Sequence, residues 1–320
     1  MKVDYRDSSG SADPWVEHVC RFHCSAIACD EWIPYRQLFL SVDDIGFRQG
    51  VTAVERLRTY GGRPFEVDAH LERLRSTIDH LRIDGLPDSA SFAAVLDELL
   101  ERNQPLIQAS RDVGITIWAT PGPATGRRTP QPTWSMHLNR LDLERIQRSW
   151  EHGQTIVVTD VQQPSSASWS RQAKVRCRLH YYLADQQARD VANDSTGALI
   201  DHDGSVTETS IANIAVVING TIRSPPAEQV LTGITQQVIE RLAAEVGVPW
   251  VRRRLTFEEM KIADEVILMG TDIGLWCGNR IIRSSYGGLE TVISKSVEKI
   301  PGRVVRTLQN RFAKLAGLLT

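Results

Sequence analysis

Two hydrophobic patterns alternate along this chain and limit the folds it can adopt. Runs rich in β-branched and aromatic residues, typical of strands, occur at residues 51–60, 113–120, 155–161 and 265–269. Between them, apolar residues recur at helical spacing, as in Phe92, Val95, Leu96, Leu99 and Leu100. This alternation predicts an α/β (α+β) fold.

The length of the chain suits two domains or one large one. It has 320 residues, 42% of them hydrophobic and 24% charged, which is typical of a globular protein. We place the domain boundary in the charged stretch 141–153. The sequence therefore predicts a smaller N-terminal α/β domain, residues 1–145, and a larger C-terminal domain, residues 146–320, which carries Lys174.

The formal net charge of −2 provides no overall attraction to nucleic acid or to a membrane surface. No apolar run approaches the length that spans a bilayer, and residues 1–7 lack the apolar core of a signal peptide. Five cysteines, an odd number, do not suggest a disulfide framework, so we expect a cytoplasmic protein.

A cysteine-rich segment, residues 20–29, admits two interpretations. Cys20, Cys24 and Cys29 could bind a metal, but their spacings are x3 and x4 instead of the paired C-x2-C of common zinc sites. Packed or surface thiols are therefore favoured, and we expect no metal.

Other local patterns give specific expectations. Residues 38–42 resemble a strand, and the helical pattern that follows Lys174 has one apolar side. That side is predicted to consist of Leu179, Leu183, Gln187 and Val191.

Lys174 is the best candidate for amine chemistry among the six lysines. The others lie at the terminus, in a polar C-terminal region or on an exposed helix face: Lys2, Lys261, Lys295, Lys299 and Lys314. Cationic neighbours, such as Arg171 and Arg176, would favour the neutral and nucleophilic amine. On this segment alone, however, a solvated basic run is the favoured interpretation.

Two further features complement this lysine. Glu208 lies in a predicted strand, and Leu231-Thr232-Gly233-Ile234-Thr235 forms a glycine turn that opens a helix. A lysine can form an imine, an acid can charge a ring nitrogen, and a helix start can bind phosphate, which are the requirements for holding a phosphorylated pyridine aldehyde. Alternatively, Glu208 is an exposed strand acid and the turn is an ordinary one. Arg73 lies off the apolar stripe of its helix and is either a surface charge or an anion contact.

The order and spacing of several motifs resemble one enzyme family. They are Asp44-Ile45-Gly46-Phe47, Val54-Glu55-x-x-Arg58, His70-Leu71-Glu72-Arg73-Leu74, Lys174, Thr207-Glu208-Thr209-x-x-Ala212-Asn213, the turn 231–235, Ala263-Asp264-Glu265 and Gly270-Thr271. This set, from about residue 38 to 272, is similar to class-IV, fold-type IV enzymes that use pyridoxal 5′-phosphate. These include branched-chain and D-amino-acid aminotransferases and aminodeoxychorismate lyase.

The resemblance implies a two-domain fold like that of D-amino-acid aminotransferase, and assigns cofactor contacts to Arg73, Lys174, Glu208, Leu231, Gly233, Ile234, Thr235 and Thr271. By this similarity, Lys174 forms the internal aldimine with the cofactor and later moves a proton at the substrate α-carbon. Glu208 is expected to keep the pyridine nitrogen protonated.

The remaining contacts follow from the same resemblance. Ile234 and Thr235 are expected to bind the phosphate at a helix start, with Arg73 and Thr271 completing the cup. Leu231 is expected to pack on the face of the ring.

The implied function is an aminotransferase that passes an amino group from an amino acid to a 2-oxo acid. Pyruvate-releasing aminodeoxychorismate lyase is the alternative, and the family implies a homodimer. Several positions depart from the family pattern, namely Gln49 for a tyrosine, Gln236 for a basic residue, and Trp118 in a strand that lacks a substrate-binding arginine. The substrate class is therefore not predicted.

A nucleic-acid-binding module is a further alternative. It would use the basic run 171–178 beside Tyr181 and Tyr182. The slightly negative net charge and the lack of a recognised binding motif argue against it.

Overall fold

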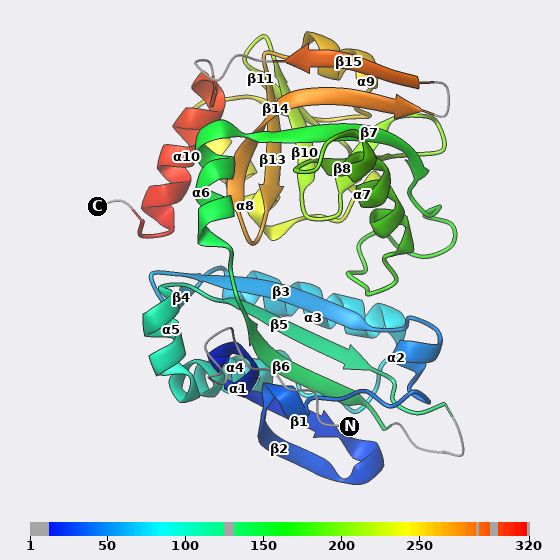
Figure 1. The fold of residues 1–320 in the computed structure, drawn as a ribbon, viewed down its shortest axis with the longest axis vertical. Helices are drawn as coiled ribbons and strands as arrows, with labels where there is room; N and C mark the ends of the chain where they lie inside the picture. The colour runs from blue at the N-terminus through cyan, green and yellow to red at the C-terminus, as the bar shows by residue number, and fades with distance from the viewer. Residues whose placement is uncertain (1–12, 125–130, 286–287, 295–299, 319–320) are drawn as a thin grey trace. The chain divides into compact units, whose positions relative to one another are not determined.

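The computed structural model describes residues 13–124, 131–285, 288–294 and 300–318. The chain forms two compact units, Met1–Leu141 with Ala173–Cys177, and Asp142–Gln172 with Arg178–Thr320 (Figure 1). The short segment that contains Lys174 thus groups with the first unit. The predicted division into residues 1–145 and 146–320 stays a prediction. Of the lysines considered above, Lys2, Lys295 and Lys299 lie outside the described residues.

The first unit is built on an antiparallel sheet. Among its described residues, the strands follow the order β2-β1-β6-β5-β3-β4. Their bounds are β1 (Val19–Cys24), β2 (Cys29–Pro34), β3 (Ala53–Tyr60), β4 (Arg63–Pro64), β5 (Gly114–Thr120) and β6 (Thr133–Asn139). The helices are α1 (Pro14–Glu17), α2 (Ile45–Arg48), α3 (Val67–Leu81), α4 (Ser89–Arg102) and α5 (Gln104–Ser110).

Strand alternation gives this sheet two different faces. On β3 and β5, Ala53, Leu57, Ile115 and Ile117 point to one side and are fully buried against the apolar stripes of α3 and α4, which cover that side (Figure 1). The intervening residues of β3, β5 and β6 point to the opposite side, which is more polar. The helix-covered side is the hydrophobic core of this unit.

Part of the N-terminal prediction is wrong. Residues 38–42 form no strand, and Phe39 and Val42 are exposed. The strands are instead β1 and β2, in the cysteine-rich segment, where Cys20 and Cys24 are buried as free thiols. A short apolar run does not by itself distinguish a strand from a loop. Along β1, alternate side chains are buried, and Cys20 and Cys24 are among them.

The second unit contains a larger mixed sheet. In the described part of this unit, its strands are β7 (Gln154–Gln162), β8 (Thr196–Ile200), β9 (Val206–Thr209), β10 (Asn213–Ile218), β11 (Thr221–Ser224), β12 (Trp250–Arg252), β13 (Glu265–Gly270), β14 (Gly274–Ser285) and β15 (Gly288–Ser294). Its helices are α6 (Leu143–His152), α7 (Leu179–Val191), α8 (Ile234–Glu245), α9 (Phe257–Ile262) and α10 (Arg303–Leu315). Short turns of tighter helix occur in both units, η1 (Ser25–Ile27), η2 (Tyr35–Gln37) and η3 (Ala227–Gln229).

Part of this sheet closes on itself. The strands run β10-β13-β14-β7-β8-β9, and β9 pairs again with β10 through Glu208 and Asn213. The ring encloses buried apolar side chains such as Ile156, Ile214 and Leu268. The predicted α/β character is therefore confirmed in both units.

Helix α7 packs differently from the predicted stripe. Leu179 and Leu183 are exposed, whereas Ala184 and Ala188 are completely buried. The reason is close packing on β8, since a Cβ placed on Gly197 would collide with the backbone and side chain of Ala184. Only small side chains fit at this contact, so the large apolar residues lie elsewhere on the helix.

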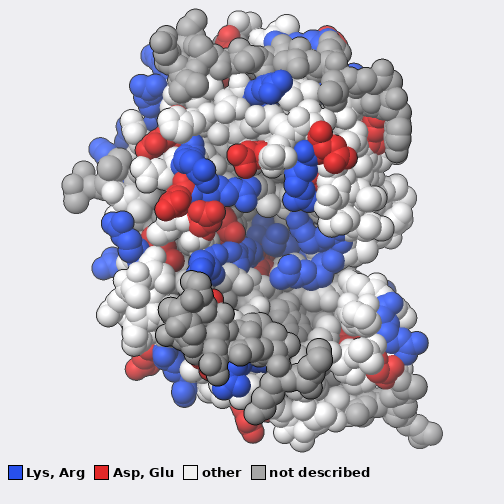
Figure 2. Space-filling model, in the orientation of Figure 1, with Lys and Arg blue, Asp and Glu red and all other residues white. Residues whose placement is uncertain are grey.

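The surface carries both signs of charge. On the face shown in Figure 2, Lys and Arg side chains occur beside Asp and Glu on each unit. Over the described residues, we find no helix long and apolar enough to cross a membrane.

A buried ion-pair cluster lies between β3 and α3. Glu55, which is fully buried, accepts hydrogen bonds from Arg73 Nε at 3.0 Å and Arg73 Nη2 at 2.7 Å, and its Oε1 lies 3.0 Å from His70 Nδ1. Burial alone would raise the pKa of Glu55, but Arg73 and His70 outweigh it and hold that pKa well below the ordinary value. Glu55 is therefore an anion that fixes Arg73.

We expect Gly197→Ala to lower the free energy of unfolding by about 1–3 kcal/mol, because the added methyl group must push α7 away from β8. Urea denaturation measures this change. Leu183→Ala, on the exposed side of the same helix, is the control and should change stability by no more than about 0.5 kcal/mol. Equal stability of wild type and Gly197→Ala would contradict the close packing.

We expect Glu55→Gln to lower the free energy of unfolding by about 3 kcal/mol at neutral pH, because Arg73 then loses its buried counter-charge. The folded pKa of Glu55 is lowered, so its stabilisation is present above the unfolded pKa of about 4.3 and is lost as the pH falls below it.

Urea denaturation across the acid range should therefore show the difference between wild type and variant narrowing below about pH 4. Glu98→Gln is a suitable control, since the pair between Glu98 and Arg102 is exposed and worth little. A difference that does not depend on pH would show that the charge of Glu55 is unimportant.

Candidate active site

Glu208 is surrounded by hydrogen-bond donors from four segments of the second unit. Its Oε1 accepts from Tyr181 Oη at 2.7 Å and Gln163 Nε2 at 2.9 Å, and its Oε2 accepts from the Leu231 amide at 3.2 Å and Asn213 Nδ2 at 3.3 Å. The residue is only 5% exposed. Donors on both oxygens stabilise its negative charge, and they fix its direction.

Tyr181 donates to Glu208 and accepts a long hydrogen bond from Gln163 Nε2 at 3.5 Å. Burial and the neighbouring charge of Glu208 raise the pKa of Tyr181 well above its ordinary value. Its ring also lies under the guanidinium of Arg178, whose carbon is 4.4 Å from the ring centroid. The hydroxyl therefore keeps its proton and directs it at Glu208.

The glycine turn lies directly beside this carboxylate. Asn213 Nδ2 donates to the Leu231 carbonyl at 2.7 Å, so one amide side chain links β10 to the turn. Gly233 is the N-cap residue of α8, and a Cβ there would collide with Asn213 Oδ1. Glycine at this position is therefore required for the turn to approach β10.

The start of α8 has the features of an anion site. Its N-cap residue, Gly233, gives no side-chain cap, so the backbone N–H groups of Ile234 and Thr235 open the helix without one. Gln236, in the same turn, is completely buried, and neither polar atom of its amide has a hydrogen-bond partner among the described residues. A buried amide of this kind is expected to meet a further polar group.

Gln172 and Arg171, which precede the lysine segment, hold the backbone before α8 in place. Gln172 donates through Nε2 to the carbonyls of Ala227 and Val230, the latter at 2.8 Å, and its Oε1 accepts from the Thr232 amide at 3.1 Å. Arg171 Nη1 donates to the Gln229 carbonyl at 3.0 Å. The loop before Lys174 and the segment before α8 are thus tied together.

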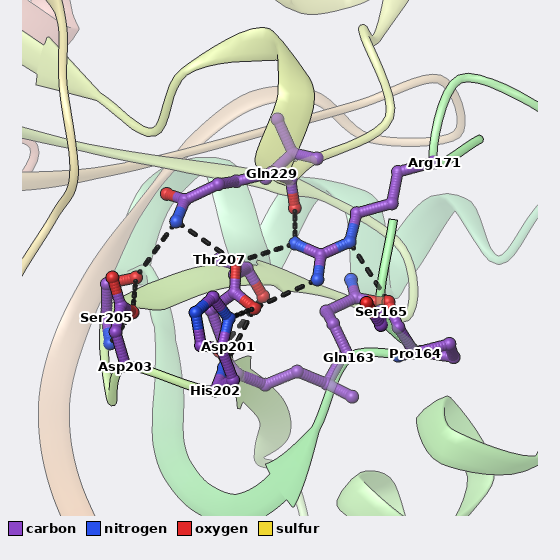
Figure 3. Close-up of polar contacts among 12 residues, drawn as sticks. Gln163, Pro164, Ser165, Arg171, Asp201, His202, Asp203, Ser205, Thr207 and Gln229 are labelled. Atoms are coloured by element: carbon purple, nitrogen blue, oxygen red, sulfur yellow. Dashed lines mark hydrogen bonds and ion pairs between the residues drawn. The ribbon is translucent and has the colours of Figure 1, made fainter. Parts of the chain in front are cut away.

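Arg171 is itself fixed by a buried ion pair. It binds both oxygens of Asp201, at 2.8 and 2.9 Å, and donates to the Pro164 carbonyl (Figure 3). Gln229 Nε2 donates to Asp201 and to Ser205 in the same cluster. Arg171 provides the strongest lowering of the Asp201 pKa, which lies well below its ordinary value.

Lys174 is held by backbone contacts in the first unit. Its amide donates to Thr77 Oγ1 on α3 at 3.1 Å, and its carbonyl accepts from the Val54 amide at 3.0 Å. Val175 pairs with Ala53 as an antiparallel bridge, and the Arg176 amide donates to the Thr52 carbonyl. The segment thus adds a short strand to the edge of β3.

The surroundings of Lys174 include the Glu55 cluster. Burial is the main cause that lowers the pKa of His70, and the positive charges of Arg73 and Lys174 lower it further, against the opposing effect of Glu55. Arg73 and Lys174 thus both lie within electrostatic range of His70.

The predicted site residues fall into two groups. Arg73 and Lys174 belong to the first unit, and the others to the second, namely Glu208, Leu231, Gly233, Ile234, Thr235 and Thr271. Within the second group, the Leu231 amide donates to Glu208. Thr271 directly follows β13, and Met269, two residues before it, is the register partner of Asn213. The predicted roles of all eight residues stay predictions.

Several residues of these networks were not singled out from sequence. Glu55 and Asn213 stood in the quoted motifs without a role. For Glu55, the available signal was a charged residue inside the largely buried strand β3, which indicates a buried partner. Gln163 and Asp201 gave no such signal, since their partners are distant in sequence. Tyr181 was named only beside the basic run of the nucleic-acid alternative, and its contact with Glu208 was not predicted. No group of three or more His, Cys, Asp or Glu that could bind a metal occurs in the described part of the chain.

The sequence matches the family model described as amino-transferase class IV over residues 52–281. D-alanine aminotransferase of Bacillus licheniformis is 26% identical over 239 residues, covering 72% of this chain and 79% of that protein. Aminodeoxychorismate lyase of Bacillus subtilis is 26% identical over 253 residues, covering 78% and 83%. Relatives with both reactions thus match to a similar extent.

Solved structures agree with the fold. The branched-chain amino acid aminotransferase of Escherichia coli superposes with a TM-score of 0.75 at 20% identity, covering 92% of this chain and 94% of the other. That of Thermobaculum terrenum, in its PLP form, gives 0.73 at 17% identity, covering 94% of both chains. These likenesses confirm the predicted fold, and the match over more than half of its length shows that this chain belongs to the class IV aminotransferase family.

Proposed function

We propose that this protein is an aminotransferase that uses pyridoxal 5′-phosphate, the cofactor of its family, to transfer an amino group from an amino acid to a 2-oxo acid. The observation that carries the proposal is the Glu208 carboxylate, which is surrounded by donors and linked through Leu231 to a helix start with a required glycine. An anion for a ring nitrogen and N–H groups for a phosphate are thus adjacent.

The residues present fit this cofactor. Glu208 offers an ionised oxygen to a protonated pyridine nitrogen. Leu231, whose amide donates to Glu208, is the residue expected to pack on the ring. The N–H groups of Ile234 and Thr235 suit a phosphate, and the buried, unpartnered amide of Gln236 offers a polar group in the same turn. We assign Arg73 and Thr271 to the same phosphate.

The proposed roles follow from the chemistry of these side chains. When bound, pyridoxal phosphate supplies a ring that withdraws electrons from the substrate α-carbon. Glu208 would hold the proton on the ring nitrogen, which would make this withdrawal effective. Lys174 would hold the cofactor through its amine, and the same amine would move the proton at the substrate α-carbon.

A pyruvate-releasing lyase is the second candidate. It is supported by the similarity to aminodeoxychorismate lyase of Bacillus subtilis, which covers 78% of this chain. The two reactions differ in what they consume. Pyruvate formed from aminodeoxychorismate without a 2-oxo acid would establish the lyase, whereas amino transfer that requires a 2-oxo acid would establish the aminotransferase.

The predicted homodimer and the cytoplasmic location remain part of this proposal. Light scattering, which measures the mass of the particle in solution, tests the homodimer.

We expect Lys174→Ala to abolish covalent attachment of the cofactor, because the amine that forms the bond is removed. The measurement is borohydride reduction with added pyridoxal phosphate, followed by mass spectrometry of the peptides. Lys261→Ala is the control and should still be labelled, since Lys261 pairs with Glu258 on α9. Labelling of another lysine, or of none in the wild type, would refute the assignment of Lys174.

We expect Tyr181→Phe to reduce kcat by about 10- to 100-fold, because it removes a hydrogen bond to a charged group, worth about 1.5–3 kcal/mol. Steady-state kinetics on protein with fully attached cofactor measures this loss. Tyr182→Phe, at the next position and exposed, is the matched control and should be unchanged. Equal rates for both variants would mean that the support of Glu208 does not matter for the reaction.

A further inference from the structure

Two cysteines face each other across the hairpin of β1 and β2, drawn in dark blue in Figure 1. Cys24, the last residue of β1, is the register partner of Cys29, the first residue of β2. Both are free thiols in the structure. Residues directly opposite each other in an antiparallel pair point to the same face of the sheet. The hairpin therefore places two thiols side by side where its strands meet the loop.

The contacts of neighbouring side chains agree with this register. His23 lies opposite Asp30, and its Nδ1 is 3.1 Å from Asp30 Oδ1. Arg21 forms an ion pair with the same carboxylate. Strand alternation puts Cys24 on the other face, where Thr133 Oγ1 of β6 donates to its Sγ at 3.6 Å. The two thiols thus share the face opposite these charged groups.

The spacing of such a pair suits a disulfide. Opposite residues of an antiparallel pair have Cα atoms about 4.5 or 5.5 Å apart, depending on their place in the ladder. Disulfides occur at Cα separations of about 4.4–6.8 Å, so either place allows a bridge. Within residues 25–28, η1 and the left-handed Ala28, with a φ of 52°, reverse the chain. The fold has therefore already brought the ends of this loop together.

The two thiols differ in access. Cys24 is only 7% exposed, whereas Cys29 is partly exposed. Burial is the largest cause that raises the pKa of Cys29, and further causes are the negative charges of Glu31, Cys24 and Asp30, which Arg21 opposes. The effect of Cys24 means that the two thiols lie within electrostatic range of each other. Cys29 thus keeps its proton at neutral pH and is the sulfur that a reagent reaches first.

We propose that Cys24 and Cys29 form a reversible disulfide, which makes this hairpin a redox modification site. The oxidant is a small-molecule disulfide such as oxidised glutathione. Cys29 loses its proton, and its sulfur attacks one sulfur of the oxidant, which breaks the S–S bond of the oxidant and releases the first glutathione thiolate. Cys24 then loses its proton and attacks the Cys29 sulfur, which forms the bridge and releases the second thiolate.

The electrons and protons of this exchange balance. The two cysteines together lose two electrons and two protons, and the oxidant gains both, so that it ends as two thiols. Among the described residues, β2 is the outermost strand at its end of the first sheet, and the bridge would tie it to β1. The inference rests on the fold of the first unit and does not depend on the proposed function.

The test treats the full chain with oxidised glutathione, stops the exchange with acid, blocks the remaining thiols with a maleimide and digests the protein with trypsin. Both cysteines lie in one tryptic peptide, residues 22–36, which contains no other cysteine. We expect mass spectrometry to show this peptide lighter by two hydrogens and without glutathione. Reduction with dithiothreitol should restore both thiols. Glutathione retained on this peptide, or two intact thiols while the exposed Cys177 has reacted, would overturn the proposal.

A comparison with the unfolded chain separates a pair made by the fold from two cysteines that are merely close in sequence. The fraction bridged is measured over a series of ratios of reduced to oxidised glutathione, in buffer and in concentrated urea. We expect the bridge to form about 10- to 100-fold more favourably in the folded chain, because unfolded residues 24–29 must lose entropy to close the loop. Equal values in both would contradict the role of strand register.

Single substitutions identify the two sulfurs. Cys20→Ser is the matched control, because Cys20 is buried on β1 like Cys24 but lies opposite Ile33, and this variant should still form the bridge. Cys24→Ser should retain glutathione on Cys29, since no second thiol is left to displace it. Loss of the bridge in Cys20→Ser, or no glutathione on Cys29 in Cys24→Ser, would count against the assigned pair. The wild-type measurements do not depend on the folding of either variant.

Discussion

The second unit depends on the place where its ring of strands closes. Glu208 of β9 and Asn213 of β10 form that closing pair, and their side chains bond to each other and to the Leu231 backbone. A buried carboxylate is costly unless donors surround it, and here those donors come from segments that are far apart in sequence. The closure and the charge therefore stabilise each other, because opening the ring would separate Glu208 from its donor Asn213.

The segment that carries Lys174 is anchored within the first unit. Residues 174–176 are fixed to β3 and to Thr77. Gln172 and Arg178, which flank this segment, belong to the second unit and bond within it, to the Thr232 amide and to the Ser210 carbonyl. The ion pair of Arg171 with Asp201 extends this anchoring to the β8–β9 hairpin. The role that we propose for the Lys174 amine needs a defined position, and a short segment anchored through its backbone provides one.

The sequence predicted those features that depend on local chemistry. The glycine turn and the start of α8 follow from the residues present, and the structure contains them. The prediction failed where tertiary packing decides the structure. Examples are the small-residue contact of α7 with Gly197 and the segment 38–42, where residues 39–42 are exposed. It also left the environment of Arg73 open, because a buried partner such as Glu55, 18 positions away, has no signature at helical spacing.

Strand alternation gives neighbouring residues of β3 different surroundings. Glu55 and Arg56 are adjacent on the strand, so their side chains point to opposite faces of the sheet. Glu55 therefore binds Arg73 on the helix-covered side, while Arg56 donates to Thr116 and Asn139 on the other face. Because Glu55 holds Arg73 through two hydrogen bonds, the direction of the Arg73 guanidinium is set by the buried pair, and the phosphate contact that we propose for Arg73 depends on that pair.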